Sequence, residues 1–283
     1  MTTELKTSEL NLSQFNSADL DMARRFGGVS RLYGISGLAK LQAAHICVIG
    51  IGGVGSWAAE AIARNAVGTI TLIDLDNIAE SNVNRQLHAV DGEFGKAKVS
   101  VMAERIRLIN PMARVIEIED FVTVENIIMM LNHGYDGVID CIDDAKAKMA
   151  VAAFCKQNQV SLVTVGGAGG RLDPTRIRQA DLSEVTGDRL LAKVRNGLRR
   201  DYHFPKGENY SFKSSAKSKA SKFGITAIYS DEPIIKPDAV CVADDSAITG
   251  LNCAGYGSSV CVTAPFGFAA AANLIQQLLN TNK

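Results

Sequence analysis

The sequence lacks several features that would assign a chain to a protein class directly. None of its six cysteines forms a C-x-x-C pair with another, so it has no zinc-knuckle signature. The polar residues 1–21 contain no apolar segment of the kind found in signal peptides. The apolar stretch 260–272 is interrupted by Pro265 and Gly267 and is shorter than the roughly 20 residues of a spanning helix. We therefore expect a cytoplasmic protein with reduced thiols and no membrane contact.

The chain also lacks net charge, because 30 basic residues balance 30 acidic ones. Overall charge therefore neither favours nor excludes a nucleic-acid partner, and only local clusters of charge can do so. Hydrophobic residues make up 47% of the 283 residues. Such a chain can bury a sizeable core as one large domain, or as one domain with a substantial insertion.

Segments typical of strands alternate with segments of helical spacing. We expect strands at 45–49, 69–73, 114–118, 137–142 and 161–165, and helices at 34–43, 53–65, 96–109, 123–131 and 145–157. This alternation predicts an α/β fold with a doubly wound, mainly parallel sheet and a Rossmann-like nucleotide-binding core. The pattern changes after Gly170, where we expect strands at 176–180 and 225–229 and helices at 188–200 and 266–279.

The predicted domain organisation follows these changes in pattern. We expect residues 1–24 to form a flexible tail and residues 25–283 a single domain. Within that domain, residues 25–170 would form the nucleotide-binding core, 171–240 a basic insert or substrate region, and 241–283 a C-terminal extension with a closing helix.

Basic residues are concentrated in one part of this insert. Between 189 and 222 there are ten of them, opposed only by Asp201 and Glu208. Four lysines lie in its Ser/Lys-rich loop: Lys213, Lys217, Lys219 and Lys222. Such a cluster in a neutral chain is a candidate for contact with a phosphate backbone, as in tRNA. The alternative is a solvated helix face followed by a soluble loop.

A glycine-rich loop joins the first expected strand to the next helix. Its glycines are Gly50, Gly52, Gly53 and Gly55. Such a loop lets backbone N–H groups approach phosphate oxygens at a helix N-terminus. Asp74 ends the next strand, where a carboxylate can accept hydrogen bonds from a ribose hydroxyl. Up to this point the pattern fits an NAD-binding domain equally well.

The residues after Asp74 favour a nucleoside triphosphate over NAD. They are the D-x-D motif 74–76, S-N-x-x-R-Q at 81–86, G-x-x-K-V at 95–99, and a strand that ends in I-D-D at 142–144. Fixed cations and a metal-binding carboxylate stabilise the charge that develops when a nucleophile attacks the α-phosphate and pyrophosphate leaves. Each residue also has a simpler interpretation: Arg85 in a surface ion pair, Lys98 solvated on a helix, and Asp143 as a helix N-cap.

Taken together, these motifs resemble the ubiquitin-activating-enzyme superfamily, whose members adenylate carboxylates with ATP. The resemblance covers residues 25–165 and implies that Gly53 and its neighbours hold phosphates and that Asp74 holds the ribose. It implies catalytic residues Arg85, Lys98 and Asp143, with Asp143 placing Mg²⁺. The implied nucleotide-binding residues also include Asp76 and Asn82. The superfamily is usually homodimeric, so Arg25 and Arg31 are candidates to reach the partner's site.

Three further segments resemble the tRNA threonylcarbamoyladenosine dehydratases within this superfamily. They are R-F-G-G-V-S-R-L-Y-G at 25–34, V-T-V-G-G-A-G-G-R-L-D-P-T at 163–175 and T-A-P-F-G-F at 263–268. The resemblance implies an ATP-driven dehydration, in which the threonyl carboxylate of N6-threonylcarbamoyladenosine in tRNA is adenylated and a ring then closes. An accessory sulfur-transfer protein is a further candidate partner.

Three other functions remain open at this stage. The first is adenylation of the C-terminal glycine of a ubiquitin-like sulfur carrier, in which Cys241 or Cys253 could take part. The second is an NAD-dependent oxidoreductase, which would not need Arg85. The third is a binding module that holds nucleotide without releasing pyrophosphate.

Overall fold

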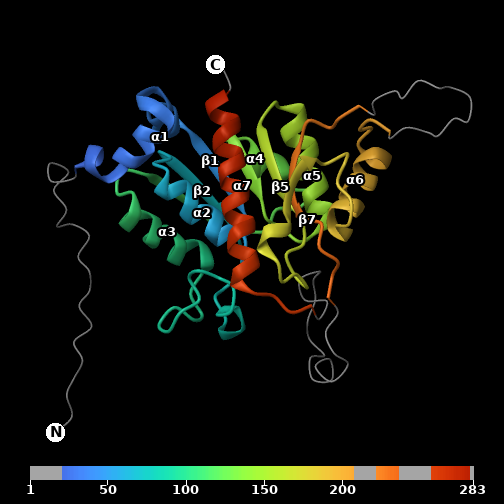
Figure 1. Cartoon of the computed structure of the whole chain (residues 1–283), viewed down its shortest axis with the longest axis horizontal. Helices are drawn as coiled ribbons and strands as arrows, with labels where there is room; N and C mark the ends of the chain where they lie inside the picture. The colour runs from blue at the N-terminus through green and yellow to red at the C-terminus, as the bar shows by residue number, and fades with distance from the viewer. Residues whose placement is uncertain (1–20, 207–220, 236–255, 281–283) are drawn as a thin grey trace, which may run out of the picture.

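One sheet lies at the centre of the structure, a computed structural model that describes residues 21–206, 221–235 and 256–280 (Figure 1). Among these residues, seven strands follow the order β3-β2-β1-β4-β5-β7-β6. The strands are β1 His45–Ile49, β2 Thr69–Ile73, β3 Arg114–Ile118, β4 Gly137–Asp140, β5 Ser161–Val165, β6 Ile177–Asp181 and β7 Thr226–Ser230. Neighbouring strands pair in parallel, except that β6 is antiparallel to β7. The predicted doubly wound, mainly parallel sheet is confirmed.

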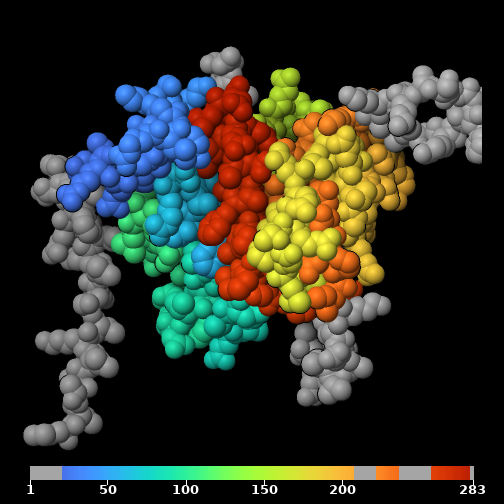
Figure 2. All heavy atoms as spheres, viewed as in Figure 1, coloured from blue at the N-terminus to red at the C-terminus, as the bar shows by residue number. Residues whose placement is uncertain are grey.

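Helices cover both faces of this sheet. They are α1 Met22–Ala43, α2 Gly55–Arg64, α3 Lys98–Ile109, α4 Ile127–Leu131, α5 Ala145–Gln157, α6 Arg189–Asp201 and α7 Val260–Asn280, with 3-10 turns η3 Glu80–Asn82 and η4 Pro174–Arg176. One core cluster contains residues from α2, α3 and α7, and a second contains residues from α4, α5 and α6. In the space-filling view α7, in red, forms a continuous band between the N-terminal helices, in blue and cyan, and the yellow and orange residues that precede α7 in the chain (Figure 2).

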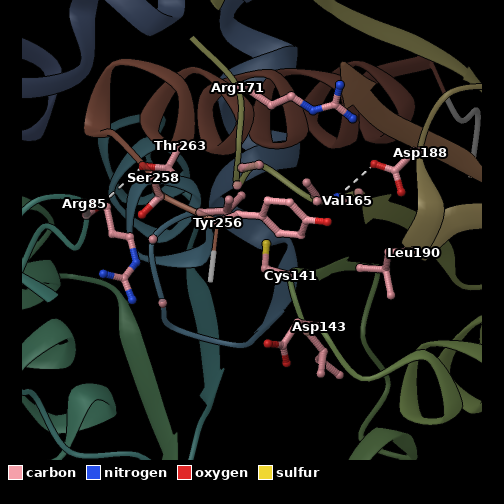
Figure 3. Close-up of a pocket in the computed structure, with 18 of the residues that line it drawn as sticks. Arg85, Cys141, Asp143, Val165, Arg171, Asp188, Leu190, Tyr256, Ser258 and Thr263 are labelled. Carbon is pink, nitrogen blue, oxygen red and sulfur yellow. Dashed lines mark hydrogen bonds between the residues drawn. The ribbon is translucent and has the colours of Figure 1, made fainter. Parts of the chain in front are cut away.

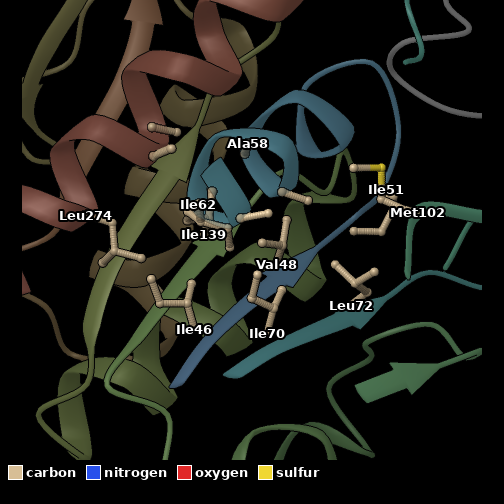
Figure 4. Packing of buried hydrophobic residues seen from close by; sticks show 14 of the residues in the cluster. Ile46, Val48, Ile51, Ala58, Ile62, Ile70, Leu72, Met102, Ile139 and Leu274 are labelled. Carbon is tan, nitrogen blue, oxygen red and sulfur yellow. The ribbon is translucent and has the colours of Figure 1, made fainter. Parts of the chain in front are cut away.

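The side chains of β1 show how one short strand supplies both cores. Ile46 and Val48 belong to the first cluster, whereas Cys47 and Ile49 belong to the second. Successive side chains of a strand point to opposite faces, so a strand between two helical layers is apolar throughout. Figure 4 shows the first cluster, in which Ile46 and Val48 lie among residues of β2, α2 and α7.

The helix boundaries differ from several predictions. α1 begins at Met22, so residues 22–24 are helical and not part of a flexible tail, and Gly34 breaks its regular geometry with φ +79°. The helix expected at 123–131 begins only at Ile127. Thr123 and Asn126 hydrogen-bond each other's backbone N–H groups through their side chains, which holds the preceding residues in a turn.

The closing helix is longer than expected at its N-terminus. α7 begins at Val260 and includes Pro265, which the sequence indicated as an interruption. Gly267 is required here for packing, because a Cβ atom on it would lie 2.5 Å from the backbone oxygen of Val54 in front of α2. Within the described residues no helix is both long and apolar enough to span a membrane.

The topology brings the functional segments to one edge of the sheet. β2 and β3 extend the sheet on one side of β1, whereas β4 and β5 extend it on the other side, so the topological switch point lies between β1 and β4. Ligands of such sheets bind beyond the carboxyl ends of the strands at this switch point. Gly50 follows β1, Asp74 follows β2, and Asp143 lies shortly after β4. These three segments therefore meet at the same place.

Candidate adenylation site

The glycine loop makes a tight turn between β1 and α2. Gly50 has φ +83°, a conformation that residues with a side chain rarely adopt. A Cβ atom on Gly55 would lie 1.8 Å from the backbone oxygen of Gly50, so only glycine allows α2 to begin this close to the loop. Gly52 and Gly53 lie between them and line the cavities described below.

Asp74 connects this loop to the end of β2. Its Oδ2 atom accepts a hydrogen bond from the backbone N–H of Ile51 at 2.6 Å, and its Oδ1 atom accepts one from Asp76 N at 2.9 Å. Burial raises the pKa of the Asp74 carboxyl above its ordinary value, and the positive charge of Lys98 acts in the opposite direction. Asp74 thus orients the loop in addition to facing the cavity.

Lys98 is the first residue of α3 and its side chain is buried, with 6% exposed. Its Nζ atom lies 2.7 Å from Asp76 Oδ2 and 4.0 Å from Asp74 Oδ1. A solvated position on a helix, the simpler interpretation of the sequence, is therefore wrong. The lysine places an ammonium group inside the cavity.

Arg85 is anchored by its backbone while its guanidinium group remains near the surface. The backbone oxygen of Arg85 accepts a hydrogen bond from Trp57 Nε1 at 3.0 Å. Its Nη1 atom donates to Ser81 O at 2.7 Å and to Asn84 Oδ1 at 2.9 Å. Asn82 is buried, and its Oδ1 atom accepts from Ala79 N at 3.1 Å, which closes the turn that carries Arg85.

Two adjacent aspartates between β4 and α5 have different structural positions. Asp144 is the N-cap of α5, and its Oδ1 atom accepts from Ala147 N at 2.7 Å. Asp143 is therefore not the helix cap that the sequence allowed. Its side chain lines the space in front of the glycine loop.

Two cavities meet at this edge of the sheet. The larger, of about 660 Å³, includes Asp74, Asp76, Asn82 and Lys98 in its wall. The smaller, of about 250 Å³, extends towards Val165 and the residues that follow it. Both are lined by Gly52, Gly53, Arg85, Cys141, Ile142 and Asp143. The structure therefore brings most of the predicted site residues together around a shared wall.

The smaller cavity contains residues that the sequence analysis did not identify as functional. Arg171 is 2% exposed, and its Nε and Nη1 atoms have no hydrogen-bond partner among the described residues. Asp188 lies across the cavity from Arg85 (Figure 3), and it accepts hydrogen bonds from Gly167 N and Leu191 N. The sequence signals for this cavity were the segments 163–175 and 263–268, whose Arg171 and Thr263 line it.

Other predicted residues lie elsewhere. Arg25 donates from Nη1 to the backbone oxygens of Leu108 and Ile109 at the end of α3, and Arg31 is exposed on α1. The Nζ atom of Lys222 lies 3.3 Å from a carboxylate oxygen of Glu184. Lys213, Lys217, Lys219, Cys241 and Cys253 lie outside the described residues.

The environment of the cysteine in the shared wall disfavours its thiolate form. Burial raises the pKa of the Cys141 thiol to about 12, and the nearby Lys148 ammonium opposes this only in part. Burial likewise raises the pKa of Cys155 to about 12. The thiolate is the reactive form, so the raised pKa values disfavour reaction of either thiol near neutral pH.

The chain is similar to several known proteins along most of its length. The model of the ThiF family matches residues 27–283. A tRNA threonylcarbamoyladenosine dehydratase of Haemophilus influenzae is 49% identical over 90% of this chain and 94% of that protein. The Escherichia coli enzyme of the same name is 44% identical over 90% of this chain and 94% of its own length.

Solved structures agree with these relatives. A crystal structure of the Escherichia coli tRNA N6-threonylcarbamoyladenosine dehydratase in complex with ATP has a TM-score of 0.78 and 42% identity, and covers 90% of this chain and 94% of that chain. A second structure of that enzyme contains AMP and matches with the same TM-score of 0.78. With the family model spanning most of the residues and these relatives spanning nearly their full length, the chain belongs to the ThiF family.

Proposed function

We propose that this protein is an ATP-dependent tRNA-modifying enzyme that adenylates the threonyl carboxylate of N6-threonylcarbamoyladenosine and drives its dehydration to the cyclic form. The observation that carries the proposal is the pair of adjoining cavities with Arg85 and Asp143 in their common wall. The larger cavity would hold ATP and the smaller would hold the acceptor carboxylate. The two reactants would then meet between these two side chains.

The properties of the larger cavity support ATP as its ligand. Its volume of about 660 Å³ suits a nucleotide, and Lys98 and Arg85 contribute positive charge to its wall. Asp74 would hold the ribose, and the N–H groups of the glycine loop would hold the phosphates. The Escherichia coli relative, whose structures contain ATP and AMP, matches 90% of this chain, which also favours an adenylating reaction over hydride transfer.

The chemistry requires no covalent bond to the protein. A carboxylate oxygen attacks the α-phosphorus, the bond to the bridging oxygen of pyrophosphate breaks, and an acyl-adenylate forms. A nucleophilic atom of the same modified base then attacks the acyl carbon and expels AMP, so that water is lost at the expense of ATP. Arg85 and Lys98 would stabilise the negative charge that develops on the phosphates.

The residues present also fit a magnesium ion. Among the described residues there is no group of three or more His, Cys, Asp or Glu side chains arranged to bind a metal. At nucleotide sites, however, Mg²⁺ is usually held by one or two carboxylates together with phosphate oxygens and water. The Asp143 carboxylate in the shared wall would be that protein ligand, and bound Mg²⁺ would neutralise charge on the phosphates.

The proposal extends to the assembly. We infer a cytoplasmic homodimer in which Arg25 or Arg31 reaches towards the partner subunit, with an accessory sulfur-transfer protein as a further partner. The lysines 213, 217, 219 and 222 would contact the tRNA backbone. The basic side chains of α6 favour this position for the nucleic acid, because Arg199 and Arg200 lie in its last turn and the helix leads into the lysine-rich segment.

Mass spectrometry of tRNA nucleosides tests this function directly. The enzyme is incubated with ATP, Mg²⁺ and tRNA that bears threonylcarbamoyladenosine. We expect a nucleoside lighter by one water that forms only when ATP is present. If the nucleoside is unchanged while a ubiquitin-like sulfur carrier supports ATP–pyrophosphate exchange, the substrate assignment is wrong although the adenylation chemistry is right.

A further inference from the structure

A fully buried ion pair lies directly behind the shared wall of the two cavities. Lys148 on α5 and Asp140 at the end of β4 are both 0% exposed, and Lys148 Nζ lies 3.0 Å from Asp140 Oδ2. The same ammonium group donates to the backbone oxygen of Asp140 at 3.0 Å and to Thr164 Oγ1 at 3.2 Å. The Thr164 hydroxyl, on the neighbouring strand β5, lies 2.8 Å from Asp140 Oδ2. These bonds satisfy the buried lysine and connect β4, β5 and α5.

The other oxygen of Asp140 holds the turn that leads to the site. Asp140 Oδ1 accepts a hydrogen bond from the backbone N–H of Ile142 at 3.1 Å. Asp143 is the next residue, so the carboxylate expected to place Mg²⁺ lies one residue beyond the position that this bond holds. On its other side the turn is packed against Gly50, where an added Cβ atom would lie 3.1 Å from the backbone of Cys141. The turn is thus held between the ion pair and the glycine loop.

The ion pair itself does not reach either cavity. Asp140, Lys148 and Thr164 are all absent from the residues that line the two spaces, whereas Cys141, Ile142 and Asp143 line both. Direct contact with nucleotide or acceptor is therefore not available to these three residues. Of the segments next to these three residues, the turn 141–143 is the one that lines both cavities.

Burial of this pair is not an obvious source of stability. The desolvation of two charges commonly offsets their attraction, and apolar residues of similar volume often stabilise a fold equally well. A bonded lysine and aspartate do, however, specify one geometry for the chain segments that they join. Because the pair lies behind Asp143, the geometry that it specifies is that of the turn 141–143.

We propose that Asp140, Lys148 and Thr164 are positioning residues that hold Asp143 in the wall between the two cavities. The inference rests on the proposed adenylation function, since it concerns the placement of the Asp143 carboxylate for that reaction. Neutralising the pair lets the turn 141–143 move relative to the glycine loop. Misplacement of a catalytic group by about 1 Å can lower the rate by about 100-fold.

The test compares two double variants. In Asp140→Asn/Lys148→Met both charges at the turn are removed with little change of volume. The matched control is Glu60→Gln/Arg105→Met, which removes an ion pair of 2.7 Å between α2 and α3 whose residues line neither cavity. Hydrogen exchange of the 141–147 segment is measured by mass spectrometry with and without an ATP analogue and Mg²⁺, and turnover is measured on modified tRNA.

We expect the first variant to exchange faster at 141–143, to lose protection by the analogue and Mg²⁺, and to turn over about 10- to 100-fold more slowly. The control should match the unmodified protein in both measurements. Unchanged exchange and turnover in the first variant would overturn the proposal, as would equal losses in the two variants. If Asp140→Asn/Lys148→Met does not fold, Thr164→Val removes one bond to each charged partner without changing the charge, and faster exchange at 141–143 is again expected.

The two proposals fail in different ways. If the proposed function is wrong, the unmodified protein produces no dehydrated nucleoside from tRNA. If the positioning inference is wrong, the exchange of 141–143 does not depend on Asp140 and Lys148. The exchange measurement needs no tRNA and no turnover, so it decides the inference in either case.

Discussion

The ammonium group of Lys98 lies 2.7 Å from a carboxylate oxygen of Asp76, and the backbone N–H of Lys98 also donates to the backbone oxygen of Asp76. Lys98 begins α3 and Asp76 follows β2, so this pair joins the helix to the edge of the sheet at the larger cavity. The Asp76 side chain is 54% exposed, whereas that of Lys98 is 6% exposed. The lysine is therefore already directed into the cavity before a phosphate arrives.

Replacing Arg85 by alanine should abolish turnover while the fold survives. Its backbone contacts remain, because Trp57 Nε1 and Thr263 Oγ1 on α7 both donate to the Arg85 carbonyl, at 3.0 Å and 3.5 Å. Loss of one charge-stabilising donor typically lowers kcat by about 100- to 1000-fold. Steady-state dehydration and a thermal melt measure the two effects. Arg107→Ala, which removes an exposed ion pair with Glu117, is the control and should keep its activity.

Asp143→Ala and Asp144→Ala should separate catalysis from stability at neighbouring positions. Asp144 caps α5, so its loss should cost about 1 kcal/mol of stability and leave most of the turnover. Asp143 caps nothing and faces both cavities, so its loss should abolish turnover with little change in Tm. Denaturant unfolding and tRNA dehydration assays check both variants. Equal effects of the two substitutions would contradict the assignment of Asp143 as the metal-placing carboxylate.

His88 should make stability depend on pH in the acidic range. It is 3% exposed, and burial, together with the charge of Lys98, lowers its pKa from 6.5 to about 4. Between these values the unfolded chain binds a proton at this histidine that the folded protein does not, so stability decreases as the pH falls. The full effect is about 3 kcal/mol. His88→Leu should flatten the dependence of unfolding free energy on pH from 6.5 to 4, which denaturant unfolding over a pH series measures.

Neutralising the lysines 213, 217, 219 and 222 to glutamine should weaken tRNA binding. Each lost phosphate contact should also reduce the slope of log affinity against log salt, by about 0.7 to 0.9. Binding is measured by fluorescence anisotropy over a salt series. ATP affinity serves as the internal control and should not change, because the lysines lie outside the sequence motifs between 50 and 144 that are expected to bind the nucleotide. An unchanged slope would remove this segment from the tRNA site.

Much of the nucleotide site could be predicted from the sequence because its signals are local. Strand and helix periodicities predicted the parallel sheet, and the order of the glycine loop, Asp74, Arg85, Lys98 and Asp143 predicted the residues around the larger cavity. Parallel strands place their carboxyl ends at one edge, so residues that follow different strands had to meet. The hydrogen bond between Thr123 and Asn126 and the close packing of Gly267 against Val54 could not be predicted from periodicity, because each depends on one particular partner residue.

The sequence by itself thus determined the fold class and named the residues that the structure brings together around the larger cavity. Only the tertiary structure decided that Asp144 and not Asp143 caps α5, that Lys98 is buried against Asp76, and that a second cavity adjoins the first. It also brought Thr164, 16 residues after Lys148 along the chain, to the buried ion pair behind Asp143. These features depend on distances and burial between residues on different elements, and periodicity along the chain contains no information about either.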